Sequence, residues 1–254
     1  MCRHLAYLGP SRDLATLLLH PPHSLLRQSY APGDMRCDAV VNADGFGAGW
    51  YPDGATTPIR YRRAIPIWAD TSFAALAGAV YSGAVVAAVR SATVGMPVTE
   101  IACSPLSSGR WLFSHNGMVT GWPGSMAALA TQLPVSDLLT LEAPTDSALL
   151  WALVRHRLMA GESLGQALGT VTAQVLTAAP GSKLNLLVTD GATLAATAVH
   201  HALAVRLGDG AVEVCSEPTS HCPGWEAVPD CHLLIATSST VDVAPIPTTT
   251  AEEP

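Results

Sequence analysis

The chain begins Met1-Cys2-Arg3-His4-Leu5-Ala6-Tyr7-Leu8-Gly9, a stretch that places a thiol directly before an apolar segment. Residues 3–8 alternate loosely in hydropathy and predict a short strand. Removal of Met1, which a small second residue permits, would give Cys2 a free α-amine beside its thiol. Because thiols titrate near pKa ~8.5 and α-amines near ~7.7–8.0, the pair can act as nucleophile and base at neutral pH. A cysteine at this position is usually incidental, so a catalytic role for Cys2 needs support from other parts of the sequence.

The order of the predicted elements favours an α+β fold. Strands come first, two longer helices follow, and strands return, without the βαβ alternation of a parallel sheet. We expect a turn at Ser82-Gly83 and an interruption of one strand at Asn116-Gly117. The expected strands are 3–8, 84–89, 111–119, 184–189, 193–199, 203–207, 211–215 and 232–236, and the expected helices are 13–19, 145–158 and 164–176.

Composition bounds the possible functions. The 254 residues are 49% hydrophobic with a mean hydropathy of +0.30, which is ample for a large core. Only 13% are charged and the formal net charge is −7, with no basic run, so no nucleic-acid partner is expected. The uncharged stretch Phe73–Val89 is short for a membrane span and predicts buried core. No signal peptide precedes the first strand, so we expect a cytoplasmic protein with free thiols and no membrane partner.

The C-terminal end differs in composition from the rest. From Val241 the sequence is rich in Pro, Thr and Glu. We therefore predict one domain over residues 2–240 and a disordered tail over residues 241–254.

Five short motifs follow one another in a fixed order: Met1-Cys2, Asn42 to Tyr51, Arg90-Ser91-Ala92-Thr93, His115-Asn116-Gly117 and Thr145-Asp146-Ser147. Together they resemble the class II glutamine amidotransferase family, whose members are Ntn hydrolases. Asn185 to Gly191 and Ser216-Glu217-Pro218 extend the resemblance, which runs from residue 2 to about residue 236. It implies a four-layer αββα sandwich of two mostly antiparallel sheets.

The resemblance also implies roles for five residues. Cys2 would attack a γ-glutamyl amide, with its α-amine as the base, and would form a thioester. Arg90 would bind the α-carboxylate of the glutamyl group, a planar bidentate match, and Asp146 would pair with its ammonium. The side-chain amide of Asn116 and the backbone N–H of Gly117 would stabilise the oxyanion, each donor contributing about 3–4 kcal/mol in such sites.

Each of these residues also has an ordinary structural interpretation. Arg90 could form a salt bridge at a strand end, Asp146 could be a helix N-cap, and Asn116-Gly117 could be a hairpin turn. Taken singly, the structural interpretation is the better one for each. The ordered set favours catalysis.

Other sites have weaker support. No CxxC or HxxxH pair occurs among the residues that could suggest zinc, so we expect no metal and no cofactor. Ser163, in a G-x-S-x-G string between two predicted helices, is expected to be a helix N-cap and not a nucleophile. The residues considered for zinc are Cys215, His221, Cys222, Cys231 and His232.

Within the family, further stretches resemble the amidohydrolases of ergothioneine biosynthesis. That likeness implies γ-glutamyl-hercynylcysteine S-oxide as the small-molecule substrate and no obligatory synthetase partner, while a homo-oligomer is possible. Val94 stands where many synthetase-linked glutaminases carry His. This difference suggests that the part of the pocket that receives the leaving group differs from that of the glutaminases. The stretches are Cys2 to Gly9, Pro21 to Leu25 with Gln28-Ser29, Asn42 to Tyr51, Pro66 to Asp70, Arg90 to Gly95 and Phe113 to Gly117.

Two alternatives stay open at this point. The chain could be a glutaminase subunit that supplies ammonia to a separate synthetase, or a non-enzymatic binding protein if Met1 is retained. For the trimethylammonium group of a hercynyl substrate, cation–π contact with an aromatic ring is the expected recognition. Trp50, Tyr51, Trp68 and Trp122 are candidates for that contact, although core or rim positions are commoner for such residues.

Overall fold

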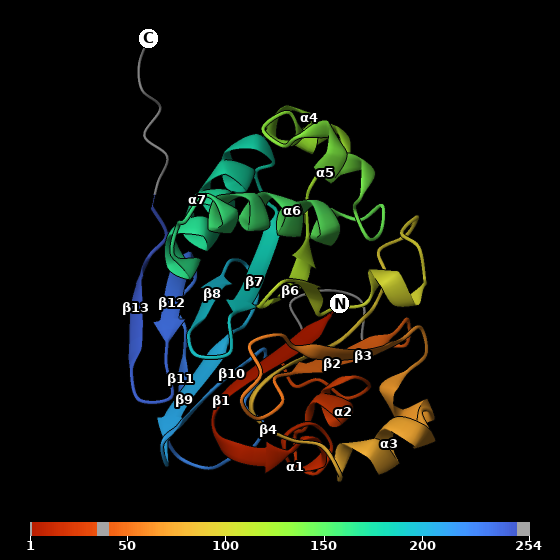
Figure 1. Ribbon diagram of the computed structural model, residues 1–254, viewed down its shortest axis with the longest axis vertical. Coiled ribbons are helices and arrows are strands. Elements are labelled where there is room, and N and C mark those ends of the chain that lie inside the picture. Colours follow the sequence, from red (N-terminus) through yellow and green to blue (C-terminus); the bar gives the residue numbers. More distant parts are fainter. Residues whose placement is uncertain (1, 35–40, 248–254) are drawn as a thin grey trace.

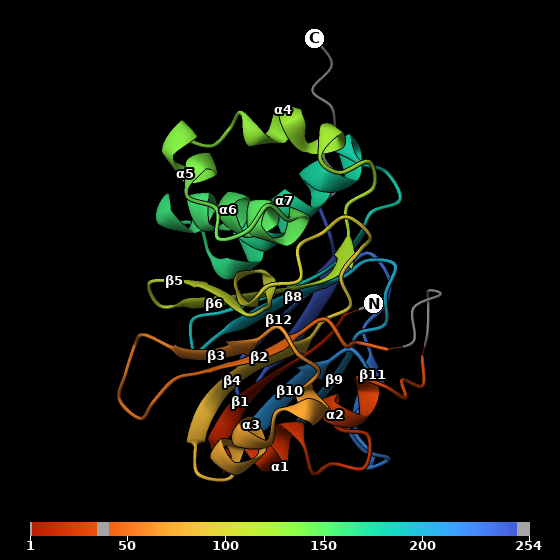
Figure 2. The ribbon, with the colours of Figure 1, turned by 90° about the vertical axis from the view of Figure 1, so that its right-hand side faces the viewer.

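Two antiparallel sheets lie face to face, and helices cover both outer faces (Figures 1 and 2). The computed structural model describes residues 2–34 and 41–247. This is the predicted four-layer αββα sandwich, so the fold class is confirmed. No helix among the described residues is long and apolar enough to cross a membrane.

The first sheet has seven strands, with β1 near its centre. In spatial order they are β11 (Trp225–Ala227), β9 (Ala204–Gly208), β10 (Ala211–Cys215), β1 (Arg3–Asp13), β4 (Tyr81–Val89), β2 (Phe46–Trp50) and β3 (Ile59–Arg63). The outer face of this sheet packs against α1 (Leu14–Leu18), α2 (Leu25–Gln28) and α3 (Thr71–Ala77).

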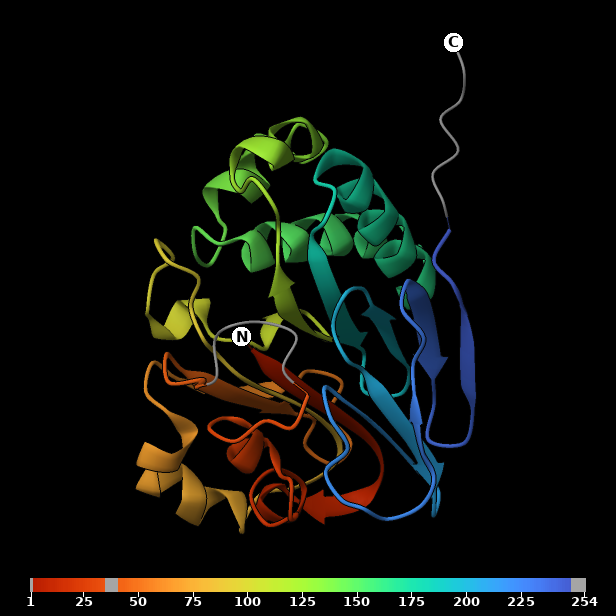
Figure 3. The same cartoon turned by 180° about the vertical axis from the view of Figure 1, so that it is seen from behind.

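The second sheet has six strands and carries the longer helices. Its order is β13 (Val241–Pro245), β12 (His232–Ala236), β8 (Leu194–Ala198), β7 (Lys183–Thr189), β6 (Trp111–Met118) and β5 (Leu106–Ser108). Helices α6 (Asp146–Met159) and α7 (Leu164–Ala178) lie across its outer face, as Figure 3 shows from behind. Shorter elements are α4 (Ala127–Ala130), α5 (Val135–Leu139) and 3-10 turns at Ile67–Ala69, Glu100–Ala102 and Gly124–Met126.

Strand β1 is buried on both faces, which explains its loose hydropathy alternation. Leu5 and Tyr7 pack in the core under α1–α3, whereas Ala6 and Leu8 pack in the core between the sheets. A strand that is buried on both sides needs apolar residues at successive positions. Full burial of one Leu side chain contributes about 1.5–3 kcal/mol, so this strand anchors two of the three cores.

The structure corrects three local predictions. Ser82-Gly83 lies inside β4, because the Ser82 hydroxyl donates to the backbone oxygen of Tyr51 (2.7 Å) and its polar group is satisfied within the sheet. Asn116-Gly117 does not break its strand but pairs with Asn185 and Leu184 of β7. The strand that begins at Arg3 continues to Asp13, past the predicted end at residue 8.

The C-terminal prediction is also wrong in part. Val241–Pro245 forms strand β13 and pairs with His232–Ala236, so disorder does not begin at Val241. Composition suggested a tail because segments rich in Pro, Thr and Glu are typical of disorder, but an edge strand tolerates Pro245. The rest of the predicted tail, 248–254, lies outside the described residues.

His4 of β1 is buried between the two sheets. Its Nδ1 lies 3.3 Å from Ser114 Oγ on β6, and its Nε2 has no hydrogen-bond partner in the described part of the chain. Burial, with smaller contributions from the charges of His115 and Arg3, lowers the pKa of His4 from 6.5 to about 3. The imidazole therefore stays neutral in the folded protein and takes up a proton on unfolding below pH 6.5.

This burial predicts a pH-dependent stability. The folded pKa is below the unfolded value, so the unfolded state binds more protons between pH 6.5 and 3, and stability falls as the pH falls through that window. Between pH 7 and pH 5 we expect His4 to account for about 2 kcal/mol of lost unfolding free energy. Urea unfolding at both pH values should show that the His4→Asn protein loses less unfolding free energy between pH 7 and pH 5 than the wild type does. The matched control His156→Asn, at an exposed position, should keep the wild-type loss, and equal losses in all three proteins would contradict the assignment.

Candidate active site

Cys2 lies directly before β1 at the edge of a small cavity between the sheets. Its thiol is partly buried, with Sγ 3.7 Å from the backbone oxygen of Ser91. The same cavity is lined by Arg90, Gly117 and Asp146. The structure thus brings together four of the five predicted residues around one space. The prediction about Met1 falls outside the described residues.

The segment before β2 holds Arg90 in place. Arg90 N donates to Gly45 O (2.8 Å), Asp44 N donates to Arg90 O (3.0 Å), and Ala92 N donates to the Asp44 carboxylate (2.7 Å). Gly45 has a φ of +138°, and a Cβ there would overlap the sulfur of Cys103. The Asp-Gly pair of the second motif therefore shapes the backbone on which Arg90 sits.

The Arg90 side chain has an unused donor. Its Nη1 is buried and makes no hydrogen bond within the described chain, and no ion pair to a described residue involves it. The structural alternative, a salt bridge at a strand end, is therefore wrong for the described residues. A buried guanidinium nitrogen without a partner is costly. A carboxylate in the adjoining cavity would satisfy it.

Asp146 is the first residue of α6 and is buried. Its Oδ2 accepts from Val119 N (3.0 Å), and its Oδ1 accepts from Ser147 N (2.7 Å). The N-cap is Thr145, whose hydroxyl accepts from Ala148 N (3.2 Å), so the proposed capping role for Asp146 is wrong. A fixed carboxylate that lines the same cavity as an arginine suits a ligand carrying both charges.

Asn116 and Gly117 lie next to each other near the end of β6. Asn116 is buried beside the cavity but not among its lining residues, and its Nδ2 donates to Ser216 Oγ (3.1 Å). Because the amide nitrogen carries two hydrogens, one is left for an oxyanion. A Cβ at Gly117 would overlap the backbone oxygen of Lys183, so only glycine fits between β6 and β7 here.

Cys103 and Cys215, the two buried thiols of the described chain, lie in surroundings that make them poor nucleophiles. Burial raises the pKa of Cys103 to about 11, and it raises the pKa of Cys215 well above its usual range. Both thiols therefore stay protonated and poorly nucleophilic at neutral pH. Cys2, unlike these two thiols, lines the cavity that also holds Arg90 and Asp146.

The residues considered for zinc do not form one cluster. Cys215 is buried in β10, whereas Cys231 and His232 lie at the start of β12. Within the described chain, Cys231 forms a possible ligand group only with His200 and Asp230, and all three are exposed. Exposed groups of this kind are common without an ion. Ser163, the other weak candidate, is the N-cap of α7 and completes a capping box with Gln166, as predicted.

The four aromatic candidates for the trimethylammonium contact lie in different surroundings. Trp50 and Tyr51 are buried, Trp122 packs against the core under α6 and α7, and Trp68 is 42% exposed and meets the edge of Tyr30. Ser216, from the motif Ser216-Glu217-Pro218 that extended the family resemblance, contacts Asn116 and so connects this region to the site.

Substitution of Gly117 should damage the fold and the site together. Gly117→Ala places a methyl group on the Lys183 carbonyl, so β6 and β7 must separate, and we expect a loss of about 1–3 kcal/mol of unfolding free energy. The control Gly78→Ala has open space around its Cβ and should be neutral or slightly stabilising. Denaturant titration measures both. Equal stability of the two variants would show that the close approach at Gly117 is absent.

Comparison with known proteins places these residues in context. The family described as glutamine amidotransferases class-II matches residues 27–208. The chain is 41% identical over 246 residues to the γ-glutamyl-hercynylcysteine sulfoxide hydrolase of Mycolicibacterium smegmatis, which covers 97% of this chain and 100% of that protein. It is also 41% identical over 243 residues to the hydrolase of the same name from Mycobacterium tuberculosis, with 95% of each chain covered.

Solved structures agree on the fold. A glutamine aminotransferase class-II domain protein from Silicibacter pomeroyi superposes with a TM-score of 0.68 at 22% identity. The match covers 97% of this chain and 100% of the other. At this identity the likeness concerns the arrangement of the sheets and helices.

Proposed function

The chain belongs to the class II glutamine amidotransferases, and from that premise we propose that it hydrolyses the γ-glutamyl amide of γ-glutamyl-hercynylcysteine sulfoxide. The products are glutamate and hercynylcysteine sulfoxide. One observation carries the proposal: Cys2 shares a cavity with an arginine that has an unpartnered nitrogen and with a fixed aspartate. A nucleophile, a cation and an anion are the three groups that a γ-glutamyl amide requires.

The proposed binding mode follows from the charges of the substrate. The α-carboxylate lies against Arg90, where it fills the vacant hydrogen-bonding position of Nη1. The α-ammonium lies against Asp146, whose carboxylate is held by Val119 N and Ser147 N. With both ends of the amino acid fixed, the γ-carbonyl is directed to Cys2, and orientation of this kind lowers the barrier by several kcal/mol.

The proposed chemistry is nucleophilic catalysis in two halves. The α-amine of processed Cys2 takes the thiol proton, and the sulfur attacks the γ-carbonyl carbon. Asn116 Nδ2 and Gly117 N donate to the oxyanion, and collapse breaks the C–N bond as the leaving nitrogen takes the proton. The resulting thioester is attacked by water, which the same α-amine deprotonates, and glutamate leaves with the thiol restored.

The substrate assignment is supported by the relatives. Two hydrolases of this name align over nearly the whole chain at 41% identity. The described cysteines are all free thiols, which supports action in a reducing compartment such as the cytoplasm. We propose that the chain acts on the small molecule without a synthetase partner.

The first test concerns the nucleophile. Cys2→Ala should reduce glutamate release from the conjugate to background, because no other described thiol lines the cavity. Cys222→Ala, which removes an exposed thiol, is the matched control and should retain full activity. A Cys2→Ala protein that still releases glutamate would refute the proposed chemistry.

The second test concerns the glutamyl group. Arg90→Met and Asp146→Asn should each lower kcat/KM for every γ-glutamyl substrate by about 100-fold or more, since each breaks a buried charge pair with substrate. The control Arg110→Ala removes an exposed guanidinium and should change kcat/KM less than twofold. If the losses were confined to one substrate, the two residues would not bind the common glutamyl part.

A panel of substrates tests the alternative. Glutamate release is measured from glutamine, γ-glutamylcysteine and the hercynyl sulfoxide conjugate. The proposal predicts the highest kcat/KM for the conjugate. Preference for free glutamine would instead support a glutaminase that supplies ammonia to a synthetase.

A further inference from the structure

A second, much larger cavity of about 470 Å³ lies between the end of β10, strand β9 and the edge strand β11. It shares no residue with the small cavity around Cys2. Its walls come from three short segments, 202–204, 216–218 and 225–228, together with His23, Gly33-Asp34 and Ser220-His221. A volume of this size is typical of small-molecule sites.

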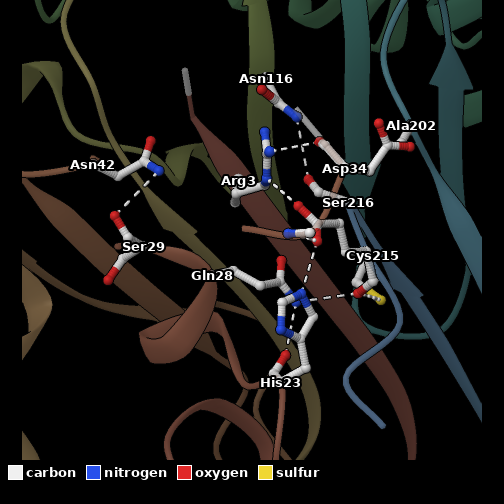
Figure 4. A network of polar contacts seen from close by, with 12 residues as sticks. Arg3, His23, Gln28, Ser29, Asp34, Asn42, Asn116, Ala202, Cys215 and Ser216 are labelled. Atoms are coloured by element: carbon white, nitrogen blue, oxygen red, sulfur yellow. Dashed lines mark hydrogen bonds and ion pairs between the residues drawn. The ribbon is translucent and has the colours of Figure 1, made fainter. Parts of the chain in front are cut away.

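One residue that lines this cavity is hydrogen-bonded to Asn116, the proposed oxyanion donor. Ser216, which lines it, accepts a hydrogen bond from Asn116 Nδ2 (3.1 Å) and another from His4 N (3.0 Å). Figure 4 shows the hydrogen bond that joins Asn116 and Ser216. Asn116 thus stands between the two cavities.

The pairing of β1 with β10 also connects the large cavity to the region of Cys2. Leu5 pairs with Cys215, and Ser216 N donates to His4 O (3.0 Å), so the chain after β10 runs antiparallel to β1 toward Cys2. Arg3 joins the two regions, since its Nη1 donates to Cys2 O (3.2 Å) and its Nη2 donates to Asp34 O (2.8 Å). A substrate whose glutamyl end lies by Arg90 must extend its other end away from that cavity.

We propose that the large cavity receives the leaving-group half of the substrate and that Trp225 and Glu226 recognise its trimethylammonium group. The inference rests on the proposed function and names the part of the site which that function leaves unassigned. It specifies the ligand by its chemistry: a permanent cation joined to an imidazole ring.

The charges of the cavity favour such a cation. None of the described residues that line it is Lys or Arg, whereas three carboxylates, Asp34, Glu217 and Glu226, contribute to its walls. Glu217 is committed to the fold, because it pairs with Arg3 (2.9 Å) and accepts from Gly33 N (2.7 Å). Glu226 is exposed and makes no hydrogen bond or ion pair within the described chain, so its charge is free for a ligand.

Trp225 supplies an aromatic surface at the same wall. The guanidinium of Arg206 lies 5.7 Å from its ring centroid and is itself tied to Glu213 (2.7 Å), which holds the ring in place. A quaternary ammonium ion cannot donate a hydrogen bond, so aromatic faces and nearby carboxylates are the groups that bind it. Trp225 and Glu226 are successive residues of the edge strand β11 and both line the cavity, so their side chains leave opposite faces of the strand and the cation would lie at the strand's edge between them.

The test compares two substrates that share the glutamyl group. For each variant, kcat/KM for the hercynyl sulfoxide conjugate is divided by kcat/KM for γ-glutamylcysteine. Trp225→Leu should lower this ratio about tenfold and Glu226→Gln about threefold, mainly through KM for the conjugate. Tyr81→Leu, which changes an exposed aromatic residue outside the cavity, should leave the ratio unchanged.

A binding measurement separates this inference from the proposed function. Hercynine alone is titrated into the Cys2→Ala protein and into the same protein with Trp225→Leu, and binding is followed by ligand-observed NMR. The inference predicts binding that the second substitution weakens about tenfold. If the wild type fails to hydrolyse the conjugate, the proposed function is wrong, and hercynine binding alone decides the role of the cavity.

Two results would overturn the inference. One is an unchanged selectivity ratio in Trp225→Leu and Glu226→Gln. The other is hercynine binding of equal strength with and without Trp225, or no binding to either protein. Glu226→Gln keeps the test usable if Trp225→Leu does not fold.

Discussion

The pairing of β1 with β4 on one side and β10 on the other is the constraint on which the rest of the site depends. Arg3 pairs with Val89, so one further step of the same register brings Cys2 beside Arg90. Leu5 pairs with Cys215, which brings Ser216 beside His4. Because β1 is buried on both faces, a slip by one residue would move Leu5 and Tyr7 into the core that Ala6 and Leu8 occupy, and Ala6 and Leu8 into theirs, so the side-chain sizes would no longer fit. The apolar packing therefore fixes the position of the thiol.

This arrangement gives the two halves of the proposed substrate different surroundings. On the Arg90 side the space is small and lined by polar groups, which suits an amino acid with fixed charges. On the Ser216 side the space is large, acidic and aromatic. Asn116 lies between the two, and the proposed mechanism assigns it to the oxyanion that forms on the scissile carbonyl. A site built in this way recognises both the glutamyl half and the leaving-group half of its substrate.

Sequence alone predicted the sandwich and selected four residues that line one small cavity, because both depend on short motifs with strict local requirements. Gly45 and Gly117 tolerate no Cβ, and Asp146 follows its N-cap directly, so these residues can be recognised wherever they stand. The leaving-group side could not be predicted. Trp225 and Glu226 reach the site only because the three-residue strand β11 pairs with β9, and that pairing has no local signal in the sequence. The edge strand β13 was missed for a related reason, since its partner and not its composition makes it a strand.

The central claim is that Cys2 acts as an N-terminal nucleophile toward a γ-glutamyl group. A diazoketone analogue of glutamine, which alkylates the nucleophile that attacks it, tests this most directly when followed by peptide mapping and intact mass measurement. The account predicts one label per chain, on Cys2 of a peptide that lacks Met1, with protection by glutamate. Labelling of another cysteine, or an active protein that retains Met1, would contradict it.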